Sequence, residues 1–257
     1  MKILKPLLNN ALSVFIKKNK WIILVIAFGA IVNCCGEFLS ANFSFFNDAG
    51  KSTFKVLCYN VKCSDDDYFK TQINIADEII KESPDLVFLC EFNRSISLRL
   101  DSIMKNKGHY KQYYRSGANC VFYSKYEIDT IVGINTSVLS GRNAKNNIVH
   151  LFLPHDTITI VGCHLSSSRK DVWGGYIYRK KEADAIYKAC IREKRPIIVM
   201  GDLNDLSCSP PVKRIEGLGL KDAWWEGGCG YGATYHDGWL RLRVDHILYD
   251  EEGMETC

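Results

Sequence analysis

The chain lacks several patterns that would decide its class at once. None of its eleven cysteines forms a Cys-x-x-Cys pair, so the spacing of a zinc or thioredoxin-like redox centre is excluded. It also lacks internal repeats and low-complexity tracts, which excludes repeat architectures. What is present is ample apolar content: 47% of the 257 residues are hydrophobic, enough to bury the core of one large or two small domains.

Excess charge is also nearly absent once residues 1–36 are set aside. The formal net charge is +4, but this segment holds five lysines and no acid: Lys2, Lys5, Lys17, Lys18 and Lys20. Removing five charges from +4 leaves −1 for the rest of the chain. A nearly neutral domain is not expected to bind nucleic acid tightly without regard to sequence, although local basic patches stay open.

Residues 21–36 form an uncharged run whose length alone does not define its type. The run has sixteen residues, whereas a transmembrane helix needs about 20 apolar residues and a secretory signal about 7 to 15. The lysines before it predict that this end stays cytoplasmic and that the chain after Glu37 is exported. We interpret residues 1–36 as an uncleaved anchor in a bacterial-type inner membrane or cell envelope.

Two alternatives to this anchor stay open. Ile31-Val-Asn-Cys34 is close to a lipoprotein signal, but Asn33 stands where a small residue is expected; the segment also suits a buried helix. Cys58, Cys90 and Cys163 lie in predicted core strands, a usage typical of a reducing compartment, which opposes export. We keep export because the lysine-flanked apolar run is the stronger signal.

Four apolar runs end in polar side chains. The runs are Phe54 to Asn60, Asp85 to Glu91, Thr157 to His164, and Pro196 to Met200, which continues into Gly201-Asp-Leu-Asn-Asp205. Side chains alternate along a strand, so the last motif is expected to point Asp202 and Asn204 together into a cleft at the sheet edge. Any one of these residues could simply face water, but together they predict a site built from strand ends.

The remaining pattern predicts an α/β fold. Helices are expected at residues 68–81, 95–107 and 175–194, and further strands at 110–114, 120–124, 128–132 and 148–153. Because strands and helices interleave without strict β-α-β repetition, we predict a four-layer α/β sandwich of two packed mixed sheets with helices outside. The predicted organisation is an anchor at 1–36, a linker at 37–52 and a catalytic domain at 53–257.

Five short motifs carry a resemblance to a known family. In order and approximate spacing, residues 54–249 resemble the endonuclease/exonuclease/phosphatase superfamily, which has a DNase-I-like fold. The matching motifs are Leu57-Cys-Tyr-Asn-Val61, Phe88-Leu-Cys-Glu-Phe92, Gly162-Cys-His-Leu165, Gly201-Asp-Leu-Asn-Asp205 and Arg243-Val-Asp-His-Ile247. Gly-Asp-x-Asn is the most specific of them. The resemblance implies the four-layer sandwich and a metal-dependent phosphodiesterase, nuclease or phosphatase.

The resemblance also implies roles for the strand-end residues. Glu91, with Asn60 beside it, is expected to hold Mg²⁺, or alternatively Mn²⁺, because hard cations prefer carboxylate and amide oxygens. Asp202 is expected to orient or deprotonate the attacking water. Asn204 and His164 are expected to donate hydrogen bonds to phosphate oxygens that gain charge in the transition state.

Asp245 is a further implied catalytic residue. In the family, an aspartate in such a strand orients a histidine from a later Ser-Asp-His-x-Pro motif, and no such motif occurs before Cys257. His246 cannot substitute, because neighbours on a strand face opposite sides. The chain is therefore expected to be either a fragment or a protein that lacks one catalytic histidine and a closing strand. If the histidine is truly missing, the alternative function is that of a non-catalytic, membrane-anchored binding module.

Two loops are expected near the substrate. They span residues 166–176 and 224–243 and carry the predicted substrate contacts Trp173, Tyr235 and Arg243, in addition to Asn60. Arg179 and Lys180 are expected on a solvated helix face. The expected substrate is a phosphoester of nucleic acid, of phospholipid or of a small molecule. The N-terminal helix is expected to bind the chain to a membrane. No obligate protein partner is predicted.

Overall fold

The computed structural model describes residues 39–47, 50–61, 68–92, 98–114, 119–134, 136, 146–154, 156–167, 172–228, 230, 232–237, 239–252 and 254–256. The predicted anchor at residues 1–36 lies outside these ranges. No helix within them has both the length and the apolar character needed to span a bilayer.

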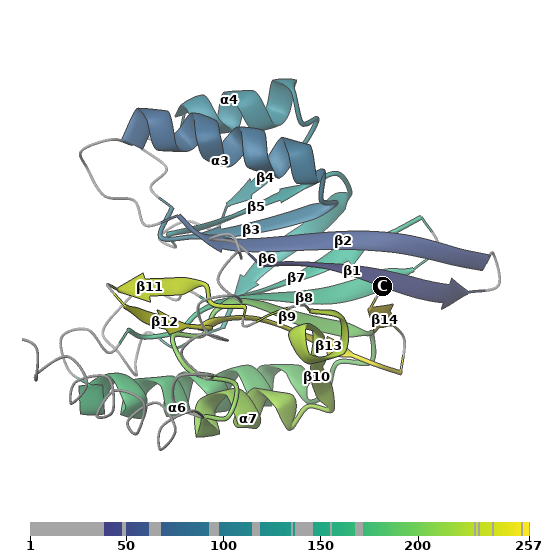
Figure 1. Ribbon diagram of the computed structural model, residues 1–257. Helices are drawn as coiled ribbons and strands as arrows, with labels where there is room; N and C mark the ends of the chain where they lie inside the picture. The colour runs from purple at the N-terminus through teal and green to yellow at the C-terminus, as the bar shows by residue number, and fades with distance from the viewer. Residues whose placement is uncertain are drawn as a thin grey trace, which may run out of the picture.

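The described strands form two six-stranded sheets that stack face to face (Figure 1). The first contains β1 (Leu39–Asn47), β2 (Gly50–Asn60), β3 (Leu86–Cys90), β4 (Lys111–Tyr114), β5 (Cys120–Ser124) and β14 (Glu255–Thr256), in the order β14-β1-β2-β3-β5-β4. The second contains β6 (Glu127–Gly133), β7 (Asn147–Phe152), β8 (Thr157–His164), β9 (Ile197–Asp202), β10 (Leu220–Asp222) and β13 (Asp245–Asp250), in the order β10-β13-β9-β8-β7-β6.

Helices cover the outer side of each sheet (Figure 1). The first sheet is covered by α3 (Tyr68–Glu82) and α4 (Leu98–Asn106), and the second by α6 (Val172–Cys190) and α7 (Pro210–Glu216). A short helix, α8 (Ala223–Gly227), and a hairpin of β11 (Tyr235–Asp237) and β12 (Leu240–Leu242) lie between β10 and β13 in the chain. The predicted helices at 68–81, 95–107 and 175–194 correspond to α3, α4 and α6 with shifts of a few residues at their ends, whereas α7, α8, β11 and β12 were not predicted.

Three buried clusters separate the four layers. One lies between the sheets and includes Val56, Phe88 and Met200. The other two fill the space between each sheet and its helices, and they include Leu57 on the first sheet and Val199 on the second. Neighbouring residues of one strand therefore enter different clusters, as period-two alternation requires. The predicted α/β sandwich of two mixed sheets with helices outside matches this arrangement.

Each sheet contains a parallel pair of strands. β2 pairs with β3 and β8 pairs with β9 in parallel, whereas the other pairings of the described strands are antiparallel. The carboxyl ends of two parallel neighbours meet at the same edge of a sheet. This topology brings the ends of β2, β3, β8 and β9, where the predicted site residues lie, to the same end of the sandwich (Figure 1).

The linker predicted at residues 37–52 is wrong for the residues that the structure describes. β1 occupies most of this segment and pairs with β2 from Leu39 opposite Cys58 to Asn47 opposite Gly50. Phe43 is fully buried and its ring lies 5.2 Å from that of Tyr249. Asn, Ser and Gly suggested a loop, but the segment forms a strand that places Phe43 in the core.

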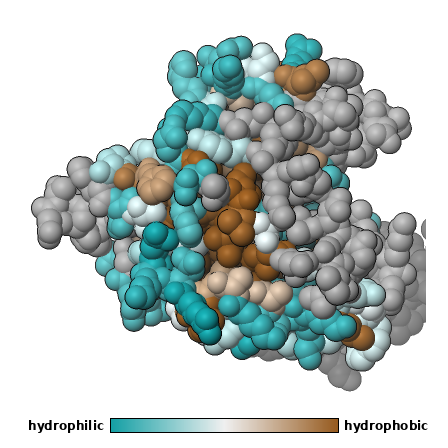
Figure 2. All heavy atoms as spheres, turned by 180° about the vertical axis from the view of Figure 1, so that it is seen from behind, coloured by the Kyte–Doolittle hydropathy of each residue, from teal (hydrophilic) through white to brown (hydrophobic). Residues whose placement is uncertain are grey.

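The face opposite to that of Figure 1 carries a hydrophobic area with hydrophilic residues to its left and below it (Figure 2). Among the described residues, the exposed apolar side chains of the second sheet include Val132 on β6 and Phe152 on β7. β6 is an edge strand, so its outer side has no neighbouring strand in the described sheet. Exposed apolar residues on an edge strand are common in proteins and do not by themselves define a binding site.

Candidate active site

Period-two alternation brings four of the predicted site residues into the space between the sheets. In β2, β8, β9 and β13, residues that pack between the sheets alternate with residues that face the helices. Every second residue of each strand faces the other sheet. At the end of the strand nearest the site, the residue of this set is Asn60 on β2, His164 on β8, Asp202 on β9 and Asp245 on β13. Core packing therefore fixes the direction in which these polar side chains point.

Glu91 reaches the same space by breaking the alternation. Cys90 is the last inward-facing residue of β3, so a continued strand would turn Glu91 toward the helices. Glu91 instead has a φ of 53°, in the left-handed region. A residue other than glycine in this region carries a strain of about 1 to 3 kcal/mol, and such strain concentrates at functional sites. The turn points the Glu91 carboxylate toward the opposite sheet.

The amide of Asn60 joins the carboxylates of the two sheets. Its Nδ2 donates hydrogen bonds to Glu91 Oε1 at 3.0 Å and to Asp202 Oδ2 at 2.8 Å. His164 Nε2 lies 3.6 Å from Glu91 Oε1. Glu91, His164 and Asp202 each offer a ligand atom, and these atoms lie within 4.8 Å of one another. The structure thus brings together four of the residues that the sequence analysis predicted for the site.

Burial alters the acidity of Asp202. The carboxyl group is 5% exposed, and this burial raises its pKa, with a further contribution from the neighbouring charge of Glu91. Hydrogen bonds from the Asn60 amide and the Asn204 backbone oppose the rise but do not cancel it. A carboxylate with a raised pKa accepts a proton more readily than an exposed aspartate, as a general base requires.

Gly201 allows the two parallel strands to approach each other beside the site. Its φ is 133°, and a Cβ placed on it would lie 2.0 Å from the carbonyl oxygen of Cys163 on β8. Every other residue type has a Cβ atom, so only glycine fits at this position. The glycine of the Gly-Asp-x-Asn motif thus allows His164 and Asp202 to end paired strands side by side.

Asn204 takes a position that strand alternation does not describe. β9 ends at Asp202, and Asn204 follows with a φ of 50°, in the left-handed region. Its Nδ2 donates to the carbonyl oxygen of Leu165 at 3.0 Å, and its backbone N–H donates to Asp202 Oδ1 at 2.8 Å. The expected continuation of the strand is therefore wrong, and Asn204 connects the loops that follow β8 and β9.

Asp245 and His246 lie on opposite faces of β13. Asp245 is buried and pairs in register with Asp202 on β9. His246 is fully buried on the other face, where its Nε2 lies 2.9 Å from the carbonyl oxygen of Asp205. This geometry confirms that His246 does not take the place of a catalytic histidine beside Asp245.

The predicted substrate contact at Arg243 is corrected by the structure. Its guanidinium is buried and donates to both carboxylate oxygens of Asp222, at 3.1 Å and 2.6 Å. Burial alone would raise the pKa of Asp222, but hydrogen bonds from His246 and Arg243 overcome this and lower the pKa to about 2. Arg243 therefore belongs to an internal ion pair, because its charge is already compensated inside the fold.

Trp173 and Tyr235 lie on surface elements and remain predicted substrate contacts. Trp173 is 72% exposed in the first turn of α6, and its ring lies 6.0 Å from that of Tyr176. Tyr235 is partly exposed on β11, and its hydroxyl lies 3.5 Å from Asp237 Oδ2. Side chains on the surface can meet a substrate without rearrangement of the core.

The expected solvated face at Arg179 is also wrong. Arg179 is 6% exposed, and its Nε donates to Asp205 Oδ2 at 2.8 Å, whereas Lys180 is exposed. The signal that identifies this burial is helical spacing: the buried residues of α6 are Gly175, Arg179, Glu182, Ala183, Ile186 and Cys190. Charge type suggested a surface position, but the period of the helix indicated the buried face.

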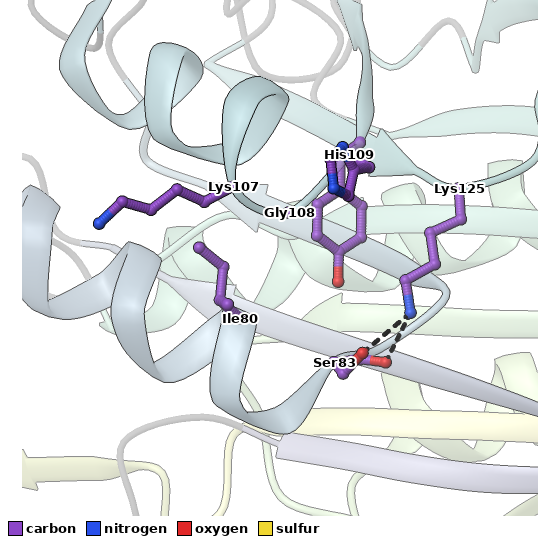
Figure 3. A pocket seen from close by; sticks show the side chains of 7 residues that line it. Ile80, Ser83, Lys107, Gly108, His109 and Lys125 are labelled. Atoms are coloured by element: carbon purple, nitrogen blue, oxygen red, sulfur yellow. Dashed lines mark hydrogen bonds between the residues drawn. The ribbon is translucent and has the colours of Figure 1, made fainter.

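A pocket lies away from this site, near the start of β3 (Figure 3). Lys125 Nζ donates there to the carbonyl oxygen of Ser83 at 2.9 Å and to its hydroxyl at 3.1 Å. The pocket is lined by Ile80, Ser83, Lys107, Gly108, His109, Tyr110 and Lys125. Helices α3 and α4 end beside this pocket, and the partly negative carbonyl ends of helices favour cations such as these lysines nearby.

Two packed mixed sheets with helices outside form an α/β sandwich, and the residues at the strand ends include a group that could hold a metal ion. A family model described as endonuclease/exonuclease/phosphatase family matches residues 57–257. The chain belongs to this family, and at the family level it is a metal-dependent phosphoester hydrolase. Comparison with the sequences of curated proteins finds no significant match.

Solved structures share the fold at low sequence identity. Caenorhabditis elegans TDP2 is 17% identical with a TM-score of 0.60, and the match covers 82% of this chain but 65% of that one. D. rerio TDP2 complexed with a single-stranded DNA product is 15% identical, with 84% of each chain covered and a TM-score of 0.60. A beta toxin from Staphylococcus aureus is 18% identical, with 78% and 86% covered and a TM-score of 0.52.

Proposed function

We propose that this chain hydrolyses a phosphoester bond by attack of water on phosphorus, with Mg²⁺ held by Glu91 and Asn60. The observation that carries the proposal is the Asn60 amide, which donates to Glu91 and Asp202 together. The carboxylates of Glu91 and Asp202 have oxygens within 4.8 Å of each other, and two negative charges at this distance favour a positive group between them. A divalent cation supplies more positive charge than the amide N–H group of Asn60. Mn²⁺ is the alternative ion, because it is also bound by carboxylate, carbonyl and water oxygens.

The donor set suits a hard cation that keeps part of its water shell. Glu91 has a side chain that is 39% exposed, so a cation bound to it would stay accessible to water and to a substrate oxygen. When bound, the ion supplies Lewis acidity, which polarises a phosphoryl oxygen and offsets charge on the leaving oxygen. Asn60 and Glu91, both from the first sheet, would hold it.

The second sheet supplies the groups that handle the water and the phosphate. Asp202 accepts the proton of the attacking water at a carboxylate whose pKa burial has raised. The hydrogen bonds from Asn60 and from the Asn204 backbone keep this carboxylate in one orientation. The buried imidazole of His164 donates a hydrogen bond to a phosphate oxygen. Asp245, paired in register with Asp202, supports the strand end from the other side.

The substrate class is proposed from chemistry that several phosphoesters share. Nucleic acid is one candidate, since D. rerio TDP2 was solved with a single-stranded DNA product. In addition, the exposed Trp173 and the partly exposed Tyr235 suit base stacking. Phospholipid and small phosphodiesters are the others, because the nearly neutral charge of residues 37–257 gives no strong attraction for duplex DNA. Single-stranded DNA, plasmid DNA and phospholipid vesicles should therefore be compared side by side.

The test pairs metal binding with turnover. We expect the chain to bind Mn²⁺, measured by electron paramagnetic resonance, and to hydrolyse bis(p-nitrophenyl) phosphate in Mg²⁺ but not in EDTA. Glu91→Ala should weaken metal binding by about 100-fold or more, because even partners outside the ligand shell cost 10- to 100-fold. Glu127→Ala is the matched control, since Glu127 is an exposed carboxylate paired with Lys111.

The two measurements separate the competing functions. Metal binding and hydrolysis that are both lost in Glu91→Ala and kept in Glu127→Ala would support the proposal. Metal binding without hydrolysis of any substrate in the panel would instead favour a non-catalytic binding module. Equal hydrolysis by wild type and Glu91→Ala would remove the assignment of the site.

A further inference from the structure

A chain of buried polar contacts runs beneath the loops that follow β8 and β9. Arg179 on α6 donates through Nε to Asp205 Oδ2 at 2.8 Å and through Nη1 to the carbonyl oxygen of Ser166 at 3.0 Å. Asp205 lies in the loop that carries Asn204, and Ser166 lies two residues after His164. One guanidinium therefore contacts both loops that deliver site residues from the second sheet.

The loop after β8 is held a second time by the same helix. Glu182, one turn after Arg179 on α6, accepts a hydrogen bond from the Ser166 backbone N–H at 2.8 Å and from its hydroxyl at 2.9 Å. Glu182 and Ser166 are both buried. Charge-assisted hydrogen bonds in a buried setting are stronger than those at a surface. The backbone two residues beyond His164 is thus fixed from two directions.

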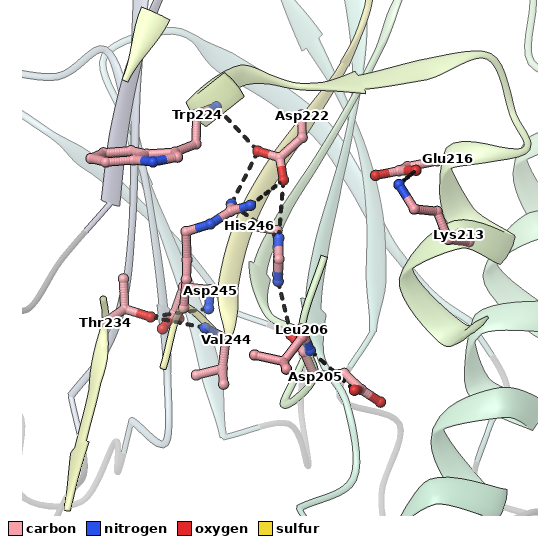
Figure 4. A network of polar contacts seen from close by, with 11 residues as sticks. Asp205, Leu206, Lys213, Glu216, Asp222, Trp224, Thr234, Val244, Asp245 and His246 are labelled. Carbon is pink, nitrogen blue, oxygen red and sulfur yellow. Dashed lines mark hydrogen bonds and ion pairs between the residues drawn. The ribbon is translucent and has the colours of Figure 1, made fainter. Parts of the chain in front are cut away.

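The loop after β9 is held from its other side by His246 (Figure 4). His246 Nε2 lies 2.9 Å from the Asp205 carbonyl oxygen, which can only accept a hydrogen bond, so Nε2 carries a proton. Nδ1 lies 3.1 Å from Arg243 Nη1 and 3.3 Å from Asp222 Oδ2. The buried Arg243–Asp222 ion pair therefore fixes the orientation of the His246 ring, whose other nitrogen binds the Asp205 carbonyl oxygen.

Asp205 is the residue at which these contacts meet. Its carboxylate is bound by Arg179 and its carbonyl by His246, so helix α6 and strand β13 both hold the loop. We propose that Arg179 and His246 act through Asp205 as positioning residues that set the relative placement of His164, Asp202 and Asn204. The inference rests on the proposed function and deepens it. Arg179, His246 and Asp205 are positioning residues because none of them is expected to contact the reacting atoms.

A purely structural role for these contacts predicts a different outcome. A contact that only stabilises the fold should lower the melting temperature without changing the catalytic constants of the folded protein. A positioning role should change those constants, because a small displacement of catalytic groups slows the reaction steeply. It should also change the environment of His164, which lies two residues before the Ser166 carbonyl group that Arg179 holds.

The closing experiment uses Arg179→Lys, which keeps the charge but cannot donate to Asp205 and Ser166 from one planar fork. We expect kcat/KM for bis(p-nitrophenyl) phosphate to fall by about 10- to 100-fold, as for outer partners of active sites. Arg214→Lys on α7 is the control, because Arg214 also binds a carboxylate but takes no part in the site. Its Nε and Nη2 donate to Asp184 Oδ1 at 3.0 Å and 2.7 Å. It should keep its activity within about twofold.

Two further measurements tie the loss to positioning. Combined with Asn204→Ala, Arg179→Lys should cost much less than it does alone, because residues that act as a unit are not additive. The ¹⁵N signal of the His164 imidazole, identified by its loss in His164→Gln, should shift in Arg179→Lys and not in Arg214→Lys. If Arg179→Lys does not fold, Asp205→Asn removes the same ion pair with a side chain of equal size.

The outcomes distinguish this inference from the proposed function. A fully additive double variant, or an unmoved His164 signal in both Arg179→Lys and Asp205→Asn, would overturn the positioning role even if wild type hydrolyses the substrate. If wild type shows no hydrolysis, the proposed function fails, and the His164 signal still decides whether Arg179 positions the loop.

Discussion

The two sheets share a plan but carry their site residues differently. Each has a parallel pair of strands, and each pair ends in two predicted site residues: Asn60 and Glu91 on the first sheet, His164 and Asp202 on the second. Glu91 is partly exposed and stands in a strained left-handed conformation. His164 and Asp202 are buried and end strands whose loops are held by several polar contacts.

This difference suits a division of labour within one site. A cation must be able to enter and keep water ligands, so an accessible carboxylate such as Glu91 fits the metal-binding side. Proton transfer and hydrogen bonding to phosphate need fixed geometry, which buried and braced groups such as Asp202 and His164 provide. The comparison therefore predicts that equivalent changes on the two sheets will have unequal effects.

The largest expected effect is on activity at Asp202. We expect Asp202→Asn to reduce kcat by about 10³-fold or more, as for loss of a catalytic base, yet to raise the melting temperature at pH 7. Burial raises the pKa of Asp202 above 3.8, so the folded state loses stability as pH rises from 3.8 through the folded pKa. The variant removes that penalty.

Glu91→Gln is the counterpart on the first sheet. It should lose activity to a similar degree but change the melting temperature little, because its side chain is not deeply buried. Calorimetric melting curves of the wild type and both variants between pH 4 and pH 8 would measure this difference. Equal changes in melting temperature for the two variants would contradict the contrast between the sheets.

A smaller effect is expected on the buried ion pair of the second sheet. Asp222→Ala leaves the Arg243 charge buried without its partner, so unfolding free energy should fall by about 3 to 5 kcal/mol. The pKa of Asp222 is about 2 in the folded state against 3.8 unfolded, so its contribution is complete above pH 4 and is lost as pH falls toward 2. Urea unfolding at pH 7 and pH 3 measures both statements.

The matched pair on the first sheet is Lys55 with Glu82. These side chains are partly exposed and lie 2.6 Å apart. Glu82→Ala should cost only about 0 to 1 kcal/mol, because water screens exposed pairs. A loss as large as that of Asp222→Ala would show that the two sheets do not differ in how strongly their ion pairs contribute.

The smallest expected effect is on the strain at Glu91. Glu91→Gly removes the strain of the left-handed conformation but adds the cost of the greater flexibility of glycine. We expect the net result to make the Glu91→Gly variant about 0.5 to 1 kcal/mol more stable than the Glu91→Ala variant. Both variants remove the same carboxylate, so the difference isolates the backbone. Guanidinium unfolding of the two variants measures this difference, and equal stabilities would mean that the strain at this turn is no larger than the cost of the flexibility of glycine.

Much of the fold was predictable because apolar period is a local property. Strands such as residues 120–124 and the helix at 68–81 were found from spacing and from the residues that end them. The strand at Leu39–Asn47 was missed because the Asn, Ser, Asp and Gly residues in and around it were interpreted as a linker, although every second residue of its first half is apolar. Composition was given more weight than period in that segment.

The site was predictable where strand geometry alone aims the side chain. Asn60, His164 and Asp202 follow from alternation, whereas the turn at Glu91 that breaks it depends on a backbone angle that no pattern encodes. Arg179 and Arg243 were misplaced because charged residues were expected at the surface. Their burial depends on partners distant in sequence, Asp205 and Asp222, which only the folded chain brings near.

The missing side chain of Gly162 has a consequence beyond packing. A Cβ there would lie 2.5 Å from Phe88 and 2.6 Å from Phe122, rings that belong to the opposite sheet. The bare backbone at this point sets how closely the two halves of the sandwich approach. Glu91 comes from one half and Asp202 from the other, so the distance between these two carboxylates depends on the packing at Gly162. A substitution at this buried position, which no substrate contacts, can therefore change the activity.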